Sequence, residues 1–406
     1  MPWHLRMLLY IFPFLLAGYF YIGWRFSQGL QYLLQLPGRS TGIAIAVLVI
    51  LLNLLPIVIL VSYLTGQLSP HYLNGSRVGW PDYFLFFPFW LGLIILVELL
   101  PYFITLDIAG LVVKWTGFMG KHNWQKWKAI FQVALVAFFV IYVGIRAYHD
   151  TYRVKTTSYD ITLKESANPI MDLKIVLVGD VQVDRYTQSQ KLDRFIEAYR
   201  KSGADLLLFS GDLVTSGPKF ISRGVQLFCG LQAPAGKIAV LGDHDYWADP
   251  QRISEGLQHC GWLFMKNEHH IISYKGHKIL ITGLTNIYSK RLQRQQLGEI
   301  LKHAPAADLK ILLVHQPSEY VASMAEKFGY RLMLAGHTHG GQLVFHPFGM
   351  PFTTSQLETK YYSGLFRLKN ISVAVTNGIG LTLAPLRYGA PAEISRLVIN
   401  PKQERN

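Results

Sequence analysis

The stretch Leu334-Ala335-Gly336-His337-Thr338-His339-Gly340-Gly341-Gln342 decides how this chain is interpreted. It follows a mostly apolar run, residues 330–334, which predicts a short buried strand. Side chains two positions apart point to the same side of an extended backbone, so we expect His337 and His339 to face one pocket. The flanking glycines permit the unusual backbone angles that present two imidazoles at a strand end. Histidine pairs also occur in loops without any chemical role, so the rest of the chain decides what this pair means.

Four further apolar runs end, like this one, in an Asp or a His. They cover residues 173–178, 206–209, 238–241 and 312–314, and they alternate with segments of helical spacing, which predicts an α/β layered domain. Ligands bind at the carboxyl ends of strands in open α/β sheets, so we expect these polar side chains to converge on one site. The side chains at the five strand ends are those of Asp180, Asp212, Asp243, His244, His315, His337 and His339.

Carboxylates and imidazoles are the side chains that hold divalent metals. A mixed set with carboxylates available for bridging fits two cations about 3.5–4 Å apart, as two-metal phosphoryl-transfer enzymes use. An Asp after a single strand is explained by an ordinary turn or helix cap. That explanation does not account for five such strand ends in one chain, so the sequence predicts a site for two divalent metal ions.

The first 150 residues have a different composition. Half of the 406 residues are hydrophobic and only 16% are charged, and the apolar residues crowd into this part. We predict a transmembrane region over residues 1–150 and a second domain over residues 151–406. Each predicted span is near or above the roughly 20 residues that cross a bilayer, and the first lacks a small-residue cleavage site, so we expect it to be retained. The four predicted spans are 5–26, 42–66, 84–112 and 129–148.

The formal net charge of +14 is explained by Lys and Arg beside anionic lipid headgroups. No nucleic-acid-binding motif appears, so we expect no nucleic-acid partner. The first and third connections contain six basic residues, and the opposite side of the membrane contains five. Because cytoplasmic loops carry an excess of Lys and Arg, this small difference weakly favours an extracytoplasmic second domain. The six are Arg25, Arg39, Lys114, Lys121, Lys126 and Lys128, and the five are Arg6, Arg77, Arg146, Arg153 and Lys155.

Three further residues leave alternatives open. Cys229 and Cys260 are either buried thiols or one bridge, so they do not fix the redox compartment. Glu98 lies inside the third predicted span, where an ionisable group is a candidate functional residue. Because no other span contains an acidic residue, we favour the alternative that Glu98 pairs within the bundle or lies near an interface.

The ordered set of strand-end motifs resembles the calcineurin-like metallophosphoesterases over about residues 155–400. That family carries D-x-H, G-D-x-x, G-N-H-[DE], a lone H and G-H-x-H after successive strands. Residues 340–342 and the segment 385–394, Pro-Leu-Arg-Tyr-Gly-Ala-Pro-Ala-Glu-Ile, are similar to the membrane-associated branch of the family. The corresponding motifs here are Gly179-Asp180-Val181-Gln182, Gly211-Asp212-Leu213-Val214, Gly242-Asp243-His244-Asp245, Val314-His315 and Gly336-His337-Thr338-His339.

The resemblance implies an α/β metallophosphoesterase domain, a β-sandwich flanked by helices, that follows the transmembrane helices. It implies that Asp180 and His339 hold a first metal and that Asp212 bridges two metals. The second metal would be held by Asp243, His315 and His337. His244 would face the substrate and protonate the leaving oxygen, while a hydroxide held by the metals attacks phosphorus in line.

Two positions depart from the family pattern. Gln182 stands where the family has a histidine, and its amide oxygen is a weaker ligand than imidazole. Asp243 stands where the family has an asparagine, and it offers a charged ligand. Both changes shift the site toward oxygen donors, which favours Mn, with Mg, Fe and Zn as the other candidates. They also leave open an alternative function, a catalytically impaired metal-binding membrane protein with a scaffolding or sensing role.

The membrane region implies a substrate at the bilayer surface, and the resemblance implies a multi-pass protein of a bacterial inner membrane. We expect hydrolysis of a phosphodiester, pyrophosphate or phosphomonoester bond, in a phospholipid or a nucleotide-sugar lipid. Lys290, Arg291 and Arg294 either contact a phosphate or headgroup or form a solvated charged face, and we favour the latter. A transporter is disfavoured because Glu98 is the one polar group that we single out within the spans.

Overall fold

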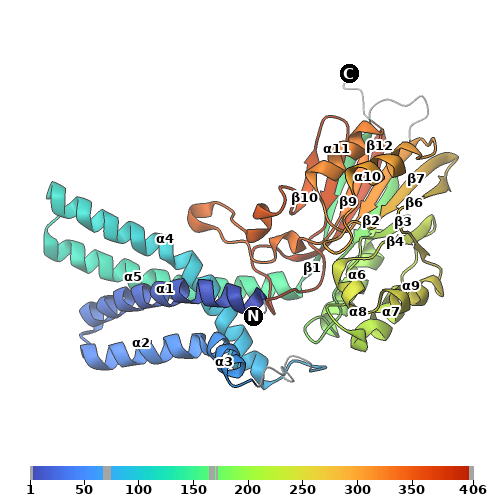
Figure 1. Cartoon of the computed structure of the whole chain (residues 1–406). Coiled ribbons are helices and arrows are strands. Elements are labelled where there is room, and N and C mark those ends of the chain that lie inside the picture. The colour runs from blue at the N-terminus through green and yellow to red at the C-terminus, as the bar shows by residue number, and fades with distance from the viewer. Residues whose placement is uncertain (1–2, 67–74, 164–169, 171, 402–406) are drawn as a thin grey trace. The chain divides into compact units, whose positions relative to one another are not determined.

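The structure is a computed structural model that describes residues 3–66, 75–163, 170 and 172–401, and it divides into two compact units (Figure 1). Unit 1 comprises Met1–Tyr148, Phe345–Phe352 and Ala384–Tyr388. Unit 2 comprises His149–Val344, Thr353–Leu383 and Gly389–Asn406. Two short segments from the C-terminal half of the chain are therefore part of the N-terminal unit.

Unit 1 consists mainly of long apolar helices (Figure 1). The helix α1, the continuous helical stretch Asp82–Thr116 and the helix α5 are each long and apolar enough to cross a membrane. They contain the whole of the predicted spans 5–26, 84–112 and 129–148. The helices are α1 (Trp3–Leu34), α2 (Gly38–Leu52), α3 (Leu54–Leu64), the π-helix η2 (Asp82–Phe86), α4 (Phe87–Thr116) and α5 (Lys121–Tyr152).

The predicted span 42–66 is not one straight helix. The helices α2 and α3 are bent by 60° at Asn53, so the region has three membrane-length helices, or up to four if the bent pair counts as one span. Pro56 is the third residue of α3 and has no N–H to continue the ladder of hydrogen bonds from α2. Proline is a usual cause of a sharp bend in a long helix. The prediction of four spans is therefore corrected to three or four apolar helices.

Glu98 lies in α4 and is only 1% exposed. Its Oε1 accepts hydrogen bonds of 2.9 Å from the Tyr388 hydroxyl and from the backbone N–H of His346. Both donors belong to unit 1 but come from the segments 345–352 and 384–388. Glu98 thus pairs inside its own unit, although its partners are these two segments and not another helix of the bundle. Through Tyr388, part of the segment 385–394 has a structural role, which is to pair with the buried Glu98 carboxylate.

We expect Glu98→Leu to destabilise unit 1, whereas Glu98→Gln is expected to be nearly neutral. Leucine leaves the buried Tyr388 hydroxyl and the His346 N–H without an acceptor, which costs about 1–3 kcal/mol for each such group. Glutamine keeps one acceptor oxygen at the same position. Thermal unfolding of the detergent-solubilised full chain measures the difference as a lower Tm for Glu98→Leu. Equal Tm values for the two variants would contradict this role.

Unit 2 contains two six-stranded sheets (Figure 1). The first has the order β1-β12-β2-β3-β4-β5, in which β2 to β5 are parallel and β12 runs antiparallel to β2. The second has the order β10-β11-β9-β8-β7-β6, in which β11, β9, β8 and β7 are parallel. The strands of the first sheet are β1 (Val154–Leu163), β2 (Leu173–Val178), β3 (Leu206–Phe209), β4 (Gly236–Ala239), β5 (Leu263–Phe264) and β12 (Ala392–Pro401). Those of the second are β6 (Glu268–Tyr274), β7 (His277–Leu284), β8 (Leu309–Val314), β9 (Leu332–Ala335), β10 (Gly364–Arg367) and β11 (Ser372–Val375).

The central strands are buried on both faces, which explains their continuous apolar sequences. In β2, Ile175 and Leu177 pack between the sheets, whereas Val176 and Val178 pack in a second core with residues of α6, α7 and α9. In the other sheet, alternate residues of β8 pack in a third core with α10 and α11. The predicted α/β domain is confirmed, as two sheets with helices on their outer faces. The helices are α6 (Gln190–Ser202), α7 (Ile221–Cys229), α8 (Asp243–Ala248), α9 (Pro250–Gln258), α10 (Arg294–Lys302) and α11 (Glu319–Lys327), with 3-10 turns at Pro218–Phe220, His339–Gly341 and Thr354–Leu357. The further 3-10 turn Pro347–Gly349 belongs to unit 1.

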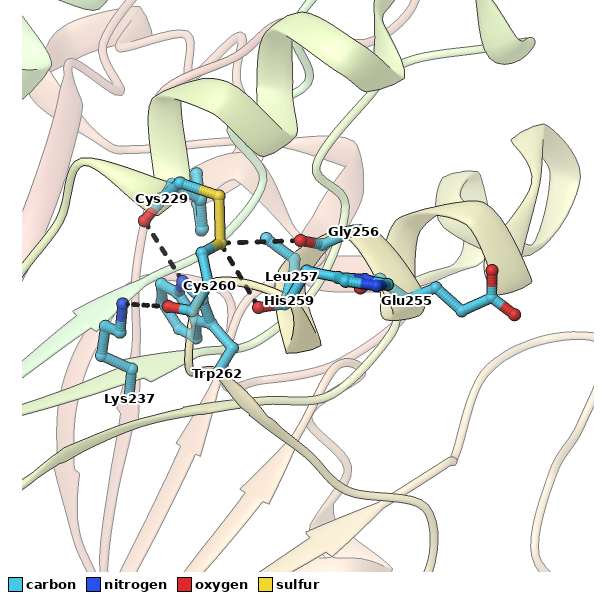
Figure 2. Close-up of a disulfide and its surroundings, with 9 residues drawn as sticks. Cys229, Lys237, Glu255, Gly256, Leu257, His259, Cys260 and Trp262 are labelled. Atoms are coloured by element: carbon cyan, nitrogen blue, oxygen red, sulfur yellow. Dashed lines mark hydrogen bonds between the residues drawn. A yellow bond between two sulfur atoms is a disulfide. The ribbon is translucent and has the colours of Figure 1, made fainter.

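Cys229 and Cys260 form a disulfide between the end of α7 and the turn that follows α9 (Figure 2). The bridge closes a sequence separation of 31 residues. It is surrounded by ordered polar contacts, since the Lys237 ammonium donates to the Cys260 carbonyl at 2.8 Å and the Trp262 indole N–H donates to the Phe228 carbonyl at 3.2 Å. Of the two alternatives that the sequence left open, the structure contains the bridge.

Candidate metal centre

The strand ends of both sheets of unit 2 bring the predicted polar residues together. Asp180 and Asp212 follow β2 and β3, and Asp243 begins α8 just after β4. From the other sheet, His315 follows β8, and the pair His337 and His339 follows β9. The carboxyl ends of parallel strands therefore supply every one of these groups, as expected for an α/β site.

The backbone at these positions is unusual. Five of the predicted site residues have a positive φ, between 42° and 73°, which is uncommon for residues other than glycine. Such conformations persist only where the surrounding structure fixes them, and they are concentrated at functional sites. A Cβ added at Gly336 would overlap with the Asp180 carboxylate, so only glycine lets the backbone approach so closely. The five residues are Asp180, Gln182, Asp212, His337 and His339.

A first group of potential ligands consists of Asp180, Asp212 and His315, which offer ligand atoms within 4.8 Å of one another. All three are fully buried or nearly so. His339 joins this group, since its Nε2 lies 3.7 Å from Oδ1 of Asp180. The backbone N–H of His337 donates to both Asp180 oxygens, at 3.0 and 2.9 Å, and so fixes that carboxylate.

A second group consists of Asp243, His315 and His337, again with ligand atoms within 4.8 Å of one another. His337 Nδ1 lies 3.4 Å from Oδ2 of Asp243 and 3.3 Å from Nε2 of His315. The same His315 Nε2 lies 3.4 Å from Oδ2 of Asp212, so this Asp and this His stand between the two groups. Ligand atoms about 2.1 Å from one cation lie about 3–3.5 Å from each other, and most of these separations fall close to that range.

The electrostatics of the cluster favour a positive charge at its centre. Burial raises the pKa of Asp180 to about 6, because a charged carboxylate loses its hydration there. Burial alone would lower the pKa of His315, but the carboxylates of Asp212, Asp180 and Asp243 outweigh it and raise that pKa to about 10. The buried carboxylates around His315 therefore favour a positive charge at this position, which a bound cation would supply.

Gln182 provides the sharpest test of whether metal fits. Its side chain is completely buried, and its amide Nε2 donates to Oδ2 of Asp212 at 3.3 Å. The amide oxygen Oε1 is also buried, yet no hydrogen-bond partner for it lies in the part of the chain that the structure describes. Buried polar atoms without a partner are rare, so we expect this oxygen to bind an ion or a water molecule. A cation bound beside Asp180 and Asp212 would satisfy it.

Two histidines are oriented through their second ring nitrogen. The Nδ1 of His315 donates to the Ser210 carbonyl at 2.8 Å, which leaves Nε2 as the ligand atom. The Nε2 of His337 lies 3.2 Å from Oε1 of Glu358, which also accepts from the Tyr288 hydroxyl at 2.5 Å. A proton on Nε2 leaves Nδ1 of His337 as its ligand atom. Carboxylate–histidine pairs of this kind fix the tautomer of metal-binding histidines.

We expect Glu358→Ala to weaken Mn binding about 10–100-fold, the usual cost of losing a partner that orients a ligand. Glu358→Gln keeps an acceptor for His337 and should lose much less. The measurement is the Mn concentration that half-activates hydrolysis by the full chain, with Glu319→Ala as the control on an exposed glutamate. Similar Mn requirements in Glu358→Ala and the wild type would show that Glu358 does not position His337.

Asp245 is a site residue to which the sequence analysis gave no role. Its carboxylate accepts three backbone N–H groups, from Asp212 at 2.7 Å, Leu213 at 2.8 Å and Gly242 at 3.0 Å. It thereby ties the loop after β3 to the loop after β4. Burial, and then the charge of Asp212, raise the pKa of Asp245 to about 7. Its place in the quoted motif Gly242-Asp243-His244-Asp245 was the available signal.

His244 has a different environment from the other histidines. Its backbone N–H donates to Oδ1 of Asp212 at 2.9 Å, and its ring lies edge-on to Trp247. The ring Nδ1 contacts the Thr215 carbonyl, which can only accept, so Nδ1 carries the proton. Neither group of clustered ligand atoms includes this half-buried side chain, so Nε2 is the ring nitrogen that can act on a substrate.

Comparison with known proteins places this site in context. The family model Calcineurin-like phosphoesterase matches residues 173–341. The chain is 28% identical to the uncharacterized metallophosphoesterase YkuE of Bacillus subtilis, over 62% of this chain and 87% of that protein. It is 26% identical to an uncharacterized metallophosphoesterase of Campylobacter jejuni, over 75% of this chain and 79% of that protein. It is also 24% identical to a transmembrane protein with metallophosphoesterase domain of Danio rerio, over 60% of this chain and 57% of that protein.

Proposed function

The chain carries a calcineurin-like metallophosphoesterase domain and is a metal-dependent phosphoester hydrolase, and on this premise we propose that it cleaves a phosphodiester or pyrophosphate bond of a lipid-linked substrate at a membrane surface. A phosphomonoester is the further possible substrate class. The observation that carries the proposal is the convergence of two ligand groups that share His315. The buried, unpartnered oxygen of Gln182 beside Asp212 supports it.

We infer that two divalent cations occupy the centre and that Mn is preferred. Asp180, Gln182 and His339 would hold the first, Asp243, His315 and His337 the second, and Asp212 both. The first set has two oxygen donors beside its one imidazole, which favours Mn or Mg over Zn. When bound, such cations neutralise charge on a phosphoryl group and lower the pKa of water toward neutrality.

The chain's own residues orient and complete the reaction. Asp245 and the His337 backbone hold Asp212 and Asp180 in place through the hydrogen bonds given above. Protonated His244 presents its Nε2–H toward the substrate, because Nδ1 is engaged by the Thr215 carbonyl. It would give that proton to the oxygen of the leaving group as the P–O bond breaks, which is general acid catalysis.

Exposed apolar side chains near the centre support a lipid-linked substrate. Trp247 packs against His244 and is 60% exposed, and Tyr288 packs against His337 and is about half exposed. Leu357, next to Glu358, is 83% exposed. Arg291 lies over the Tyr288 ring, with its guanidinium carbon 5.4 Å from the ring centroid, where a second phosphate could be held. This combination suits a substrate with both an anionic and an apolar part.

We further propose that the domain faces the extracytoplasmic side of a bacterial inner membrane. The disulfide between Cys229 and Cys260 supports this, because disulfides persist in oxidising compartments and are rare in the cytoplasm. The excess of basic residues in the first and third connections points the same way, although six against five is a small excess.

A labelling experiment tests the orientation. In a variant with both native cysteines replaced by serine, we expect Lys201→Cys, on the exposed end of α6, to react with a membrane-impermeant maleimide in intact spheroplasts. Asn123→Cys, in the first turn of α5, should react only after the membrane is permeabilised. The reverse pattern would place the domain in the cytoplasm.

The function itself is tested with the full chain in detergent. We expect the metal-free protein to be inactive toward bis-p-nitrophenyl phosphate and to become active when Mn is added. Addition of Zn should restore less activity. Mn binding at two sites without hydrolysis of any diester, monoester or lipid pyrophosphate would instead support the alternative of a catalytically impaired metal-binding protein, for which Gln182 and Asp243 give the structural reason.

A further inference from the structure

A cavity of about 760 Å³ lies within unit 1, between α1, α4 and α5. It is far along the chain from the metal ligands, and neither the family match nor the sequence motifs include it. Its lining combines cationic, aromatic and apolar side chains, among them Arg25, Lys114, Lys121, Lys128, Trp124 and Leu111.

The charges in this cavity are unbalanced. Among the described residues that line it, Asp107 is the one carboxylate, and four side chains are cationic. Asp107 Oδ2 lies 2.6 Å from the Arg25 guanidinium, and Oδ1 lies 2.5 Å from the Lys128 ammonium. Within the described ranges no carboxylate pairs with Lys114 or Lys121, so the cavity has an excess of three positive charges.

Arg25 has a donor that remains to be satisfied. Its side chain is about one-fifth exposed, stacks on Trp24 and bonds Asp107, yet its buried Nε–H has no hydrogen-bond partner in the part of the chain that the structure describes. Buried N–H groups are nearly always paired. An anion in the cavity would balance part of its excess positive charge, to which the Arg25 guanidinium contributes.

The surroundings of the cavity have the composition expected at the headgroup level of a bilayer. Trp115 and Phe118, between the lining residues of α4 and α5, are 88% and 84% exposed, and Trp127 is about half exposed. Aromatic side chains of this kind gather where a membrane helix meets the interface. Leu111, Val113 and Met119 give the cavity an apolar wall as well.

From these observations we propose that this cavity binds the phosphate-bearing headgroup of an anionic phospholipid. Basic pockets between membrane helices recognise such headgroups by charge. Lys114 and Lys121 would contact the phosphate, the Arg25 guanidinium would add positive charge, and the apolar wall would contact the start of an acyl chain. The apolar wall and the interfacial aromatic residues favour a lipid over a soluble phosphate ester of the same charge. This site is independent of the phosphoesterase chemistry.

Native mass spectrometry of the full chain in detergent tests the proposal, with phosphatidylglycerol and phosphatidylcholine as probes. We expect one phosphatidylglycerol to bind and to be retained, and phosphatidylcholine to bind more weakly. Each cation near an anionic headgroup contributes about a fivefold factor in affinity, so Lys114→Gln combined with Lys121→Gln should weaken phosphatidylglycerol binding about 30-fold. Glycerol 3-phosphate, as the soluble probe, should not compete at equal concentration.

Matched single variants distinguish a site from general surface charge. Lys121→Gln and Lys126→Gln make the same change on α5, but only Lys121 lines the cavity. We expect phosphatidylglycerol binding to weaken about fivefold with Lys121→Gln and to stay unchanged with Lys126→Gln. Hydrolysis of a soluble diester should be unchanged in both, which shows that the protein is folded. Equal losses in the two variants, or equal binding of the two lipids, would overturn the proposal. Effective competition by glycerol 3-phosphate would assign the cavity to a soluble anion instead.

Discussion

Replacement of Asp212 by asparagine is expected to reduce diester hydrolysis by about a thousandfold or more. Loss of one group that stabilises developing charge costs about 100–1,000-fold in other enzymes. Asp212 is placed to support both cations, because its Oδ2 lies 3.4 Å from His315 Nε2 and it also belongs to the group with Asp180. The neutral amide removes one negative charge from the centre, so we expect the Mn content of the purified protein to fall together with the activity.

The control for this variant is Asp193→Asn, which makes the same chemical change on the exposed face of α6. It should leave both activity and Mn content unchanged. An Asp212→Asn protein that is folded by circular dichroism and still retains more than about a tenth of the activity would show that Asp212 does not hold the cations.

Replacement of His244 by alanine is expected to lower the rate of hydrolysis of an alkyl diester about 100–10,000-fold, the usual contribution of a general acid, without loss of metal. The structural reason is that His244 lies outside both ligand groups, although its backbone N–H donates a hydrogen bond to Asp212. The Mn content of the purified protein therefore distinguishes the two variants, because His244→Ala should keep its Mn and Asp212→Asn should lose it.

The dependence on the leaving group identifies the role of His244. A p-nitrophenolate group leaves without protonation, so His244→Ala should lose little rate with bis-p-nitrophenyl phosphate and much more with an alkyl diester. His270→Ala, on the exposed edge strand β6, is the matched control. A loss of the same size with both substrates would mean that His244 positions the substrate and does not protonate it.

The sequence was sufficient to predict the α/β domain and the group of residues at its strand ends. Mostly apolar runs such as 173–178 and 312–314 mark strands that are buried on both faces. The polar residue directly after each run lies at the same edge of its sheet whatever the details of packing. Asp180, Asp212 and His315 could therefore be expected to meet, although more than 130 positions separate the first from the last.

Contacts that depend on loop packing had no such signal. Glu358 follows a short 3-10 turn and reaches His337 only through the path of the loop that contains it. The two donors to Glu98 come from segments about 250 and 290 positions further along the chain. The bend at Asn53 was not predicted either. A hydropathy pattern does not show that Pro56 lacks a backbone N–H and so interrupts the hydrogen bonds of the helix.

Anomalous diffraction from Mn-loaded crystals of the full chain tests most directly whether these residues hold two cations. The prediction is two Mn peaks about 3.5–4 Å apart, one beside Asp180 and the Gln182 amide oxygen and the other beside Asp243 and Nδ1 of His337. A single peak, no peak, or peaks away from the ends of these strands would contradict it.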